Sequence, residues 1–206
     1  MNLHYKYWYF QSVIPERICD DIVRLGHQLK DQMAVTSGFG NKKLNEKQVK
    51  DLKKKRNSNV VWMDDRWIFK EIQPYVHKAN KLAGWNFEWD WSESCQFTKY
   101  SKGQYYGWHC DSWDKPYNRP NTPAHGKIRK LSVTVSLSDP KKYQGGELEF
   151  DLKNGIPGKK HIVKCNEILP KGSLVVFPSH IWHRVCPVKK GERNSLVIWN
   201  LGWPFK

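Results

Sequence analysis

The segment Leu169 to Trp199 reads LPKGSLVVFPSHIWHRVCPVKKGERNSLVIW, and its pattern decides the fold class. Three short apolar runs begin within it: Ser173 to Phe177, Trp182 to Val185 and Ser195 to Leu201. Runs of about four to eight residues that are rich in β-branched and aromatic side chains and bounded by glycine or proline are typical of β-strands. The segment therefore predicts consecutive strands rather than helices.

Similar short runs occur throughout the second half of the chain. From Asn86 onward polar and apolar residues alternate, beginning with Phe87, Trp89 and Trp91. Further runs, separated by turn signals such as Asp139-Pro140 and Gly145-Gly146, are Cys95 to Tyr100, Leu131 to Leu137, Glu147 to Asp151 and His161 to Cys165. Many short strands at this spacing indicate a sandwich or a barrel.

The first ninety residues carry helical signals instead. Apolar residues recur at helical spacing after Pro15, at Ile18, Ile22, Leu25 and Leu29. A second helical segment begins near Asp64, a candidate N-cap, and carries Ile68, Ile72, Tyr75, Val76 and Leu82. Pro74 interrupts this segment, which predicts either a kinked helix or two short helices. Between the two helical segments, residues 37–59 form a basic, glycine-punctuated stretch that we interpret as a long mobile loop.

Length and composition favour one folded domain. The chain has 206 residues, of which 14% are aromatic, with 11 tryptophans. Such a chain can bury a core and is not of the disordered class. We therefore expect a single domain over 1–206, with helices and the basic loop in 1–90 and the β half in 91–206. The fold class is α+β, mainly β.

The formal net charge is +15, and much of the excess lies in Lys42 to Arg56, which holds eight basic residues against Glu46 and Asp51. A solvated loop is the first interpretation of this stretch, and a nucleic-acid surface is the second. Five cysteines without a CxxC pair argue against a disulfide framework and against a structural zinc site. No leader peptide and no membrane-spanning run is evident, so we expect a cytoplasmic protein that does not bind a membrane. We also expect this protein to be a monomer.

The residues that carry chemistry are His109, Asp111 and, far downstream, His183. Side chains alternate across a strand, so His109 and Asp111 should share one face. A histidine from a distant strand would complete a triad of two histidines and one carboxylate, which binds iron and leaves positions open. A closed zinc site would need a fourth ligand, and none is evident. An HxD pair also arises by chance, and a single histidine such as His183 is more often structural.

Arg193 favours the interpretation of these three residues as a metal site. It follows His183 across a tight Lys-Lys-Gly turn, and we expect hairpin geometry to bring it beside the metal pocket. A guanidinium can bind a carboxylate through two parallel hydrogen bonds. The distal carboxylate of 2-oxoglutarate requires such a partner, so Arg193 is the candidate residue for it.

Four motifs together resemble the 2-oxoglutarate/Fe(II) oxygenases, and among them the prolyl 4-hydroxylase-like group, over residues 94–205. The first motif is Tyr100-x-x-Gly103-Gln104-x-Tyr106-x-x-His109-x-Asp111. The others are Gly145-Gly146-Glu147-Leu148, Leu169-Pro-Lys-Gly172-Ser-Leu-Val-Val-Phe177 before the distal histidine, and the closing run from Arg193 to Trp199.

The resemblance implies a catalytic double-stranded β-helix, or jelly roll, with flanking N-terminal helices. It implies Fe(II) on His109, Asp111 and His183, 2-oxoglutarate as cosubstrate and ascorbate as the reductant that rescues oxidised iron. Tyr100 would line the cosubstrate site beside Arg193, with Trp199 near the same pocket, while Tyr106 and Trp108 would face the substrate channel. Core packing is the competing role for Tyr106, Trp108 and Trp199.

The substrate that the resemblance implies is a prolyl residue of a peptide or protein. Collagen-type prolyl hydroxylases usually present lysine where this chain has Arg193, whereas the oxygen-sensing type and several microbial relatives present arginine, so the subgroup stays open. Three alternatives remain. The first is an AlkB-type nucleic-acid demethylase, although that group carries a second arginine where this chain has Trp199. The others are a hydroxylase of a free amino acid or small molecule, and a jelly-roll binding module without catalysis.

Overall fold

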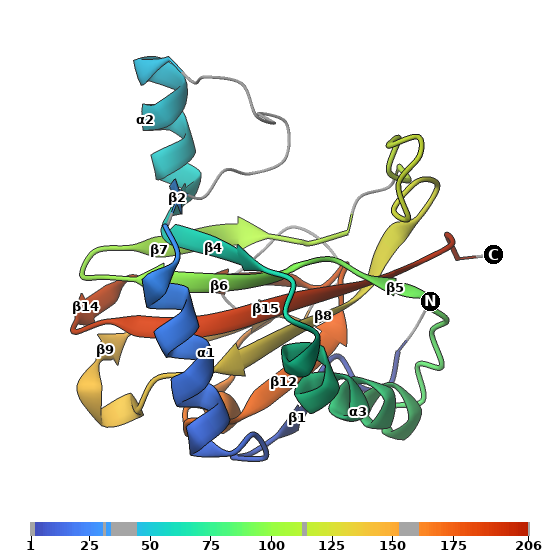
Figure 1. The fold of residues 1–206 in the computed structure, drawn as a ribbon, viewed down its shortest axis with the longest axis horizontal. Coiled ribbons are helices and arrows are strands. Elements are labelled where there is room, and N and C mark those ends of the chain that lie inside the picture. Colours follow the sequence, from blue (N-terminus) through green and yellow to red (C-terminus); the bar gives the residue numbers. More distant parts are fainter. Residues whose placement is uncertain (1–2, 31, 34–44, 113–114, 153–160, 206) are drawn as a thin grey trace.

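The computed structural model describes residues 3–30, 32–33, 45–112, 115–152 and 161–205. The helices among these residues are α1 (Glu16–Gln28), α2 (Glu46–Lys55) and α3 (Arg66–Leu82), followed by the short 3-10 helices η1 (Pro140–Lys142) and η3 (Asn166–Ile168). The remaining described elements are antiparallel strands, as Figure 1 shows.

The larger sheet has the order β1-β12-β8-β15-β6-β4-β2, with β5 also paired to β15. Its strands are β1 (Trp8–Phe10), β2 (Gln32–Met33), β4 (Asn59–Met63), β5 (Trp91–Ser92), β6 (Cys95–Tyr100), β8 (Ile128–Ser136), β12 (Leu174–Pro178) and β15 (Arg193–Gly202).

The second sheet has the order β11-β10-β13-β7-β3, and a separate pair joins β14 to β9. These strands are β3 (Arg56–Asn57), β7 (Tyr105–His109), β9 (Gln144–Gly145), β10 (Leu148–Asp151), β11 (Ile162–Lys164), β13 (Trp182–Val185) and β14 (Val188–Lys190).

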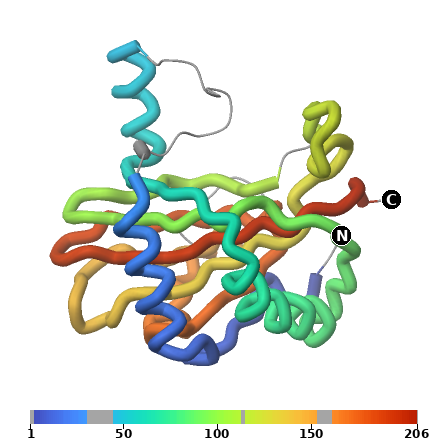
Figure 2. Tube along the Cα trace, viewed as in Figure 1, coloured from blue at the N-terminus to red at the C-terminus, as the bar shows by residue number. Residues whose placement is uncertain are grey.

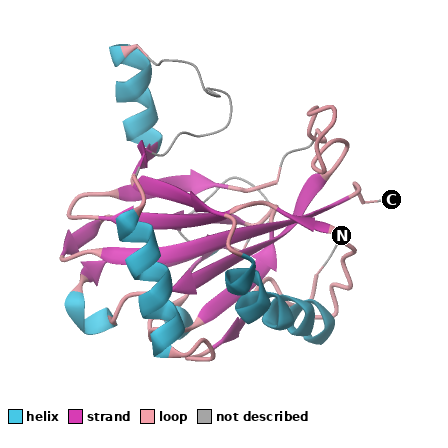
Figure 3. Cartoon of the chain, in the orientation of Figure 1, coloured by secondary structure: helices cyan, strands magenta, loops and turns pink. Residues whose placement is uncertain are grey.

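Two apolar clusters fix the layers. Helices α1 and α3 cover one face of the larger sheet, where Ile22, Ile72 and Phe97 belong to one buried cluster; Figure 3 shows the two cyan helices in front of the strands. The other face of the larger sheet packs on the second sheet through residues such as Phe150 and Phe177, whose ring centroids lie 5.0 Å apart. Two antiparallel sheets packed in this way, with helices outside, form the expected jelly roll.

The predicted strands after residue 94 are present with small shifts of their ends. The alternation at Phe87 and Trp89 does not form a strand, however: only Trp91–Ser92 pairs with β15, and Phe87 packs instead in the helical core. Pro74 does not divide the second helical segment into two helices and does not end it, because α3 continues through Pro74 as one helix. A helix can tolerate proline when the lost hydrogen bond is compensated by packing, and Ile72 and Val76 on either side are fully buried.

The interpretation of residues 37–59 as a mobile loop is wrong for its described part, while Lys42 and Lys43 lie outside the described residues. Glu46–Lys55 forms α2, which stands out from the sheets in Figure 2. Asn45 and Gln48 form a capping box, and Leu52 is buried. Lysine, glutamine and glutamate are good helix formers, so a basic composition did not exclude a helix here.

The first ninety residues also contribute strands to both sheets. β1 pairs with β12, β4 pairs with β6, and β3 pairs with β7, the strand that carries His109. The N-terminal part therefore extends the β layers as well as supplying helices. No helix among the described residues is long and apolar enough to cross a membrane.

Candidate metal centre and cosubstrate pocket

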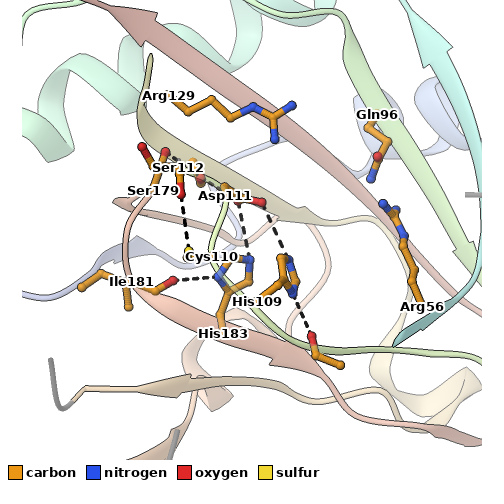
Figure 4. A network of polar contacts seen from close by, with 12 residues as sticks. Arg56, Gln96, His109, Cys110, Asp111, Ser112, Arg129, Ser179, Ile181 and His183 are labelled. Atoms are coloured by element: carbon orange, nitrogen blue, oxygen red, sulfur yellow. Dashed lines mark hydrogen bonds and ion pairs between the residues drawn. The ribbon is translucent and has the colours of Figure 1, made fainter. Parts of the chain in front are cut away.

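His109, Asp111 and His183 converge at one end of the space between the sheets, as Figure 4 shows. The Nε2 atom of His109 lies 3.7 Å from one Asp111 carboxylate oxygen, and the Nε2 atom of His183 lies 3.6 Å from the other. The three candidate ligand atoms all lie within 4.8 Å of one another. Two imidazole nitrogens and one carboxylate oxygen at this spacing can bind one divalent ion on one face.

Backbone carbonyls orient both imidazoles. The Nδ1 atom of His109 lies 2.8 Å from the Gly107 carbonyl oxygen, and that of His183 lies 2.9 Å from the Ile181 carbonyl oxygen. A carbonyl can only accept, so each Nδ1 carries the proton and each Nε2 presents its lone pair to the site. Burial, together with the neighbouring His183, lowers the pKa of His109 to about 3, which keeps this imidazole neutral and able to bind a metal.

Asp111 is ionised and held in place. Burial alone would raise its pKa, but His183, His109 and Arg129 outweigh burial and lower the pKa to about 2. The Ser132 hydroxyl donates a hydrogen bond of 2.7 Å to Asp111 Oδ2, and the Asp111 amide donates to the carbonyl of Ser179. Asp111 lies beyond the end of β7, so these contacts, rather than strand alternation, bring its carboxylate beside His109.

A β-bulge in β7 decides which of its side chains face the site. His109 pairs with His183 and Tyr106 pairs with Val185, so three steps along β7 match two along β13. Tyr106 thereby lines the same pocket as His109, and the two rings stack with centroids 3.5 Å apart. Trp108 is not among the residues that line this pocket, because its ring lies under the guanidinium of Arg184, 4.8 Å from the Cζ atom.

Arg193 and Tyr100 lie together on the larger sheet. They pair across β15 and β6, both are almost fully buried, and the Arg193 Cζ atom lies 5.6 Å from the Tyr100 ring. Arg193 reaches the pocket from the sheet opposite His183, not from a hairpin partner of His183. Gly146 leaves room for it, since a Cβ there would lie 2.8 Å from Arg193 Cδ and the residue has a φ of +70°.

Trp199 also lines the pocket and is buried. Its indole interacts with the Asp111 carboxylate and contributes to the low pKa of that carboxyl. The Arg129 guanidinium lies over the indole ring, 3.7 Å from its centroid, and forms an ion pair with Glu93. Arg129, paired with Glu93, therefore packs against Trp199 and remains a positive neighbour of Asp111.

Several lining residues were not found from the sequence. They are Gln96, Thr134 and Ser195 from the larger sheet, with Ser132 behind Asp111. The signal was present in the alternation of Leu131 to Ser136 and of Cys95 to Tyr100, where Gln96, Tyr100 and Thr134 line the pocket. Polar residues on one face of a strand are usually taken as the solvated side, and here both faces are buried. No pattern in the sequence indicates the burial of Arg56, because this residue ends a run of exposed lysines.

With this geometry in place, comparison with known proteins identifies the family. Residues 95–200 match the sequence model of the 2OG-Fe(II) oxygenase superfamily. The chain belongs to this superfamily. The matched range contains the three candidate metal ligands, Tyr100 and Arg193, and the superfamily takes its name from Fe(II) and 2-oxoglutarate. The donor set of two imidazoles, each with its Nε2 directed into the site, and one carboxylate fits Fe(II), and the buried guanidinium of Arg193 fits a carboxylate of the cosubstrate.

Curated relatives of this oxygenase are bacterial PKHD-type hydroxylases. One from Xanthomonas axonopodis pv. citri is 37% identical over 103 residues, which is 50% of this chain and 41% of the relative. Another from Pseudoalteromonas atlantica is 36% identical over 105 residues, again 50% of this chain and 41% of the relative. The chain thus spans less than half of the length of these relatives.

Solved structures similar to this oxygenase share its fold. A viral collagen prolyl hydroxylase from Paramecium Bursaria Chlorella virus-1, in complex with 2-oxoglutarate, gives a TM-score of 0.64 at 20% identity over 97% of both chains. A Pseudomonas putida prolyl-4-hydroxylase gives 0.66 at 18% identity, covering 96% of this chain and 92% of that one. A Trichoplax adhaerens prolyl hydroxylase with a hypoxia-inducible-factor peptide gives 0.67 at 15%, covering 96% and 84%.

Proposed function

We propose that this oxygenase is an Fe(II)- and 2-oxoglutarate-dependent dioxygenase that hydroxylates a prolyl residue in a peptide or protein. The observation that carries the proposal is the buried His109, Asp111 and His183 cluster with Arg193 lining the same pocket. Family membership supports the reaction type, and the names of the relatives support the prolyl substrate.

The chain's residues have separate tasks in this reaction. Fe(II), held by His109 Nε2, Asp111 and His183 Nε2, supplies the activation of dioxygen together with 2-oxoglutarate. The Gly107 and Ile181 carbonyls keep both imidazoles in the tautomer that can bind the metal. Arg193 binds the distal carboxylate of the cosubstrate, and Tyr100 beside it contributes a hydroxyl. Trp199 and Tyr106 form apolar walls that exclude water from the pocket.

The substrate and cellular setting follow from weaker indications. The peptide bound to the Trichoplax protein and the proline named in the solved structures support a peptide substrate. All five cysteines are free thiols, which fits a reducing compartment such as the cytoplasm. Ascorbate is the expected reductant of oxidised iron, and a monomer remains our expectation.

Mass spectrometry of proline-rich peptides tests the proposal. Peptides incubated with the protein, Fe(II), 2-oxoglutarate and ascorbate should gain the mass of one oxygen on proline, with one succinate formed for each. The matched control replaces proline by 4,4-difluoroproline, which blocks the target carbon and should give no product. A protein that binds neither Fe(II) nor 2-oxoglutarate would contradict the assignment.

A further inference from the structure

Arg56 is a buried cation that the proposed reaction does not use. It begins β3, pairs with Tyr106 of β7 and is only 4% exposed. The residues before it, Lys53, Lys54 and Lys55, are all exposed. Arg56 thus ends a run of exposed basic residues but is itself buried. Its burial needs an explanation, because taking a charged side chain out of water is costly.

The contacts of Arg56 leave its charge unbalanced. Its Nε donates to the Ser58 hydroxyl at 3.0 Å, and its Cζ lies 4.4 Å from the centroid of the Tyr106 ring. Its Nη2 is buried and has no hydrogen-bond partner among the described residues. No carboxylate of the described chain forms an ion pair with it. A hydroxyl and an aromatic face stabilise a guanidinium, but neither supplies a negative charge.

Arg56 lies close to the reaction site. The Tyr106 ring that it covers also stacks on His109, so one ring separates the guanidinium from a candidate iron ligand. In Figure 4, the side chain of Arg56 points toward that of Gln96, which lines the pocket. Ser58, its hydrogen-bond partner, is in turn hydrogen-bonded to Tyr100. The guanidinium therefore lies directly behind Tyr106, a residue that lines the active-site pocket, rather than on a distant surface.

The charges expected in the loaded pocket balance without Arg56. Two positive charges of Fe(II) face the Asp111 carboxylate and the dianionic cosubstrate, and Arg193 supplies the remaining positive charge. Arg129 is neutralised by Glu93. The Arg56 charge is the one left over among the described residues of the site. A hydrogen bond from Arg56 to the amide oxygen of Gln96 would also leave that charge unbalanced.

We infer that Arg56 binds a carboxylate of the substrate, so the substrate class is one that carries an acidic group near the carbon to be hydroxylated. This inference rests on the proposed function and narrows it. The carboxylate has two sources, the α-carboxylate of a C-terminal residue and the side chain of an acidic residue next to proline. A buried guanidinium with free donors is suited to either, since it can form a bidentate pair with any carboxylate.

Two matched pairs of probes separate these sources. The first pair is N-acetyl-L-proline and N-acetyl-L-prolinamide, and the second is acetyl-Pro-Asp-amide and acetyl-Pro-Asn-amide. Binding is measured by calorimetry without oxygen, on protein loaded with Fe(II) and 2-oxoglutarate. The acid of one pair should bind at least about tenfold more tightly than its amide, because a charge-assisted pair is lost in the amide. The pair that shows the preference identifies the source.

Arg56→Met should reduce that preference to within about threefold, whereas Arg56→Lys should keep part of it because the charge remains. The affinity of Arg56→Met for 2-oxoglutarate should stay within about threefold of wild type, since Arg193 binds the cosubstrate. The ligand-free Arg56→Met protein should melt at the same temperature as wild type or higher, because an unbalanced buried charge has been removed. A merely structural arginine would instead lower the melting temperature.

The outcomes that overturn the inference are distinct from failure of the proposed function. Wild-type protein that binds 2-oxoglutarate but prefers neither acid would overturn the role of Arg56 alone. An acid preference that survives in Arg56→Met, or a loss of 2-oxoglutarate affinity without loss of that preference, would also overturn it. Wild-type protein that fails to bind Fe(II) and 2-oxoglutarate would overturn the proposed reaction first.

Discussion

The two faces of the larger sheet use the same strands for different purposes. On β6, β8 and β15 the residues that face α1 and α3 are apolar, such as Phe97, Val133 and Leu196. Their immediate neighbours on the opposite face, Gln96, Thr134 and Ser195, are polar and equally buried. The second set faces the pocket that contains His109, Asp111 and His183.

This difference shows where stability and chemistry reside. Apolar burial on the helix-facing side stabilises the fold at about 25 cal/mol per Å² of buried surface. Polar burial on the pocket side contributes little net stability, because each hydrogen bond replaces one to water. Substitutions on the outer face should therefore change stability, and substitutions on the inner face or at the metal ligands should change binding and turnover.

The largest expected effect is that of Asp111→Ala. Removing one of three ligands should lower turnover by more than about 100-fold, since even changes behind a ligand often cost 10- to 100-fold. The fold should survive, because the helix-facing core is untouched. Succinate formation with substrate present measures the effect.

Ser132→Ala is the matched control for Asp111→Ala, because it leaves all three candidate ligands in place and removes only a hydroxyl that contacts the Asp111 carboxylate and the Ser179 hydroxyl. Its turnover should fall by about 10-fold or less relative to wild type, which is a smaller loss than that of Asp111→Ala. Near wild-type succinate formation by Asp111→Ala would show that Asp111 does not bind the iron.

Phe97→Ala tests the outer face. Phe97 is fully buried against Gly26 of α1, and a Phe→Ala change in a core costs about 3–5 kcal/mol. Chemical denaturation should show this loss, while 2-oxoglutarate affinity per folded molecule stays near wild type. Thr98→Val, at the next residue, should cost only about 1 kcal/mol because it removes one acceptor of a Gln96 hydrogen bond. Equal losses of stability at the two positions would erase the distinction between the faces.

Arg193→Ala tests the inner face. A charged hydrogen bond is worth about 1.5–3 kcal/mol, so 2-oxoglutarate should bind about 10- to 100-fold more weakly. Iron affinity should change little, because Arg193 is not a candidate ligand. Calorimetric titration of the Fe(II)-loaded protein gives the affinity, and Ser195→Ala, which removes a contact of Arg193, is the milder control. An unaltered 2-oxoglutarate affinity would rule out the role of Arg193.

The same comparison explains what the sequence could predict. Helix-facing positions such as Ile18 and Ile22, and strands such as Cys95–Tyr100, follow directly from apolar periodicity. His109, Asp111, His183 and Arg193 were identifiable because their spacing forms motifs. The role of Trp108 in the substrate channel stays a prediction; a bulge in β7, which periodicity does not reveal, turns Tyr106 rather than Trp108 toward the pocket beside His109. Arg56 was hidden because its burial depends on β3 pairing with β7, a contact between residues about fifty positions apart.

The smallest expected effect concerns the lysines of α2, which belong to the basic stretch Lys42 to Arg56. The helix is fixed to the metal-bearing strand: Leu52 is buried, and the Tyr105 hydroxyl of β7 lies 3.0 Å from the carbonyl oxygens of Lys53 and Lys54. Gly107 of the same strand allows this approach, since a Cβ there would lie 3.0 Å from the Lys55 carbonyl oxygen. The exposed charges of α2 are therefore held at a fixed place beside the strand that carries His109, where they can attract an acidic peptide.

Changing Lys53, Lys54 and Lys55 together to glutamine tests this role without disturbing the helix, because glutamine and lysine have similar helix propensities. Arg56 is excluded from this set because it is buried and has its own proposed role. At low ionic strength kcat/KM for an acidic proline-containing peptide should fall by about three- to tenfold, and the deficit should shrink as salt screens the wild-type attraction. Decarboxylation of 2-oxoglutarate without peptide should be unchanged. Lys141 and Lys142 on η1, also exposed, provide the matched control, since their change to glutamine alters net charge without altering α2. If both variants lose the same activity, net charge alone attracts the peptide. If neither does, α2 has no part in substrate capture, and Arg56 remains the basic residue of this region that acts on the substrate.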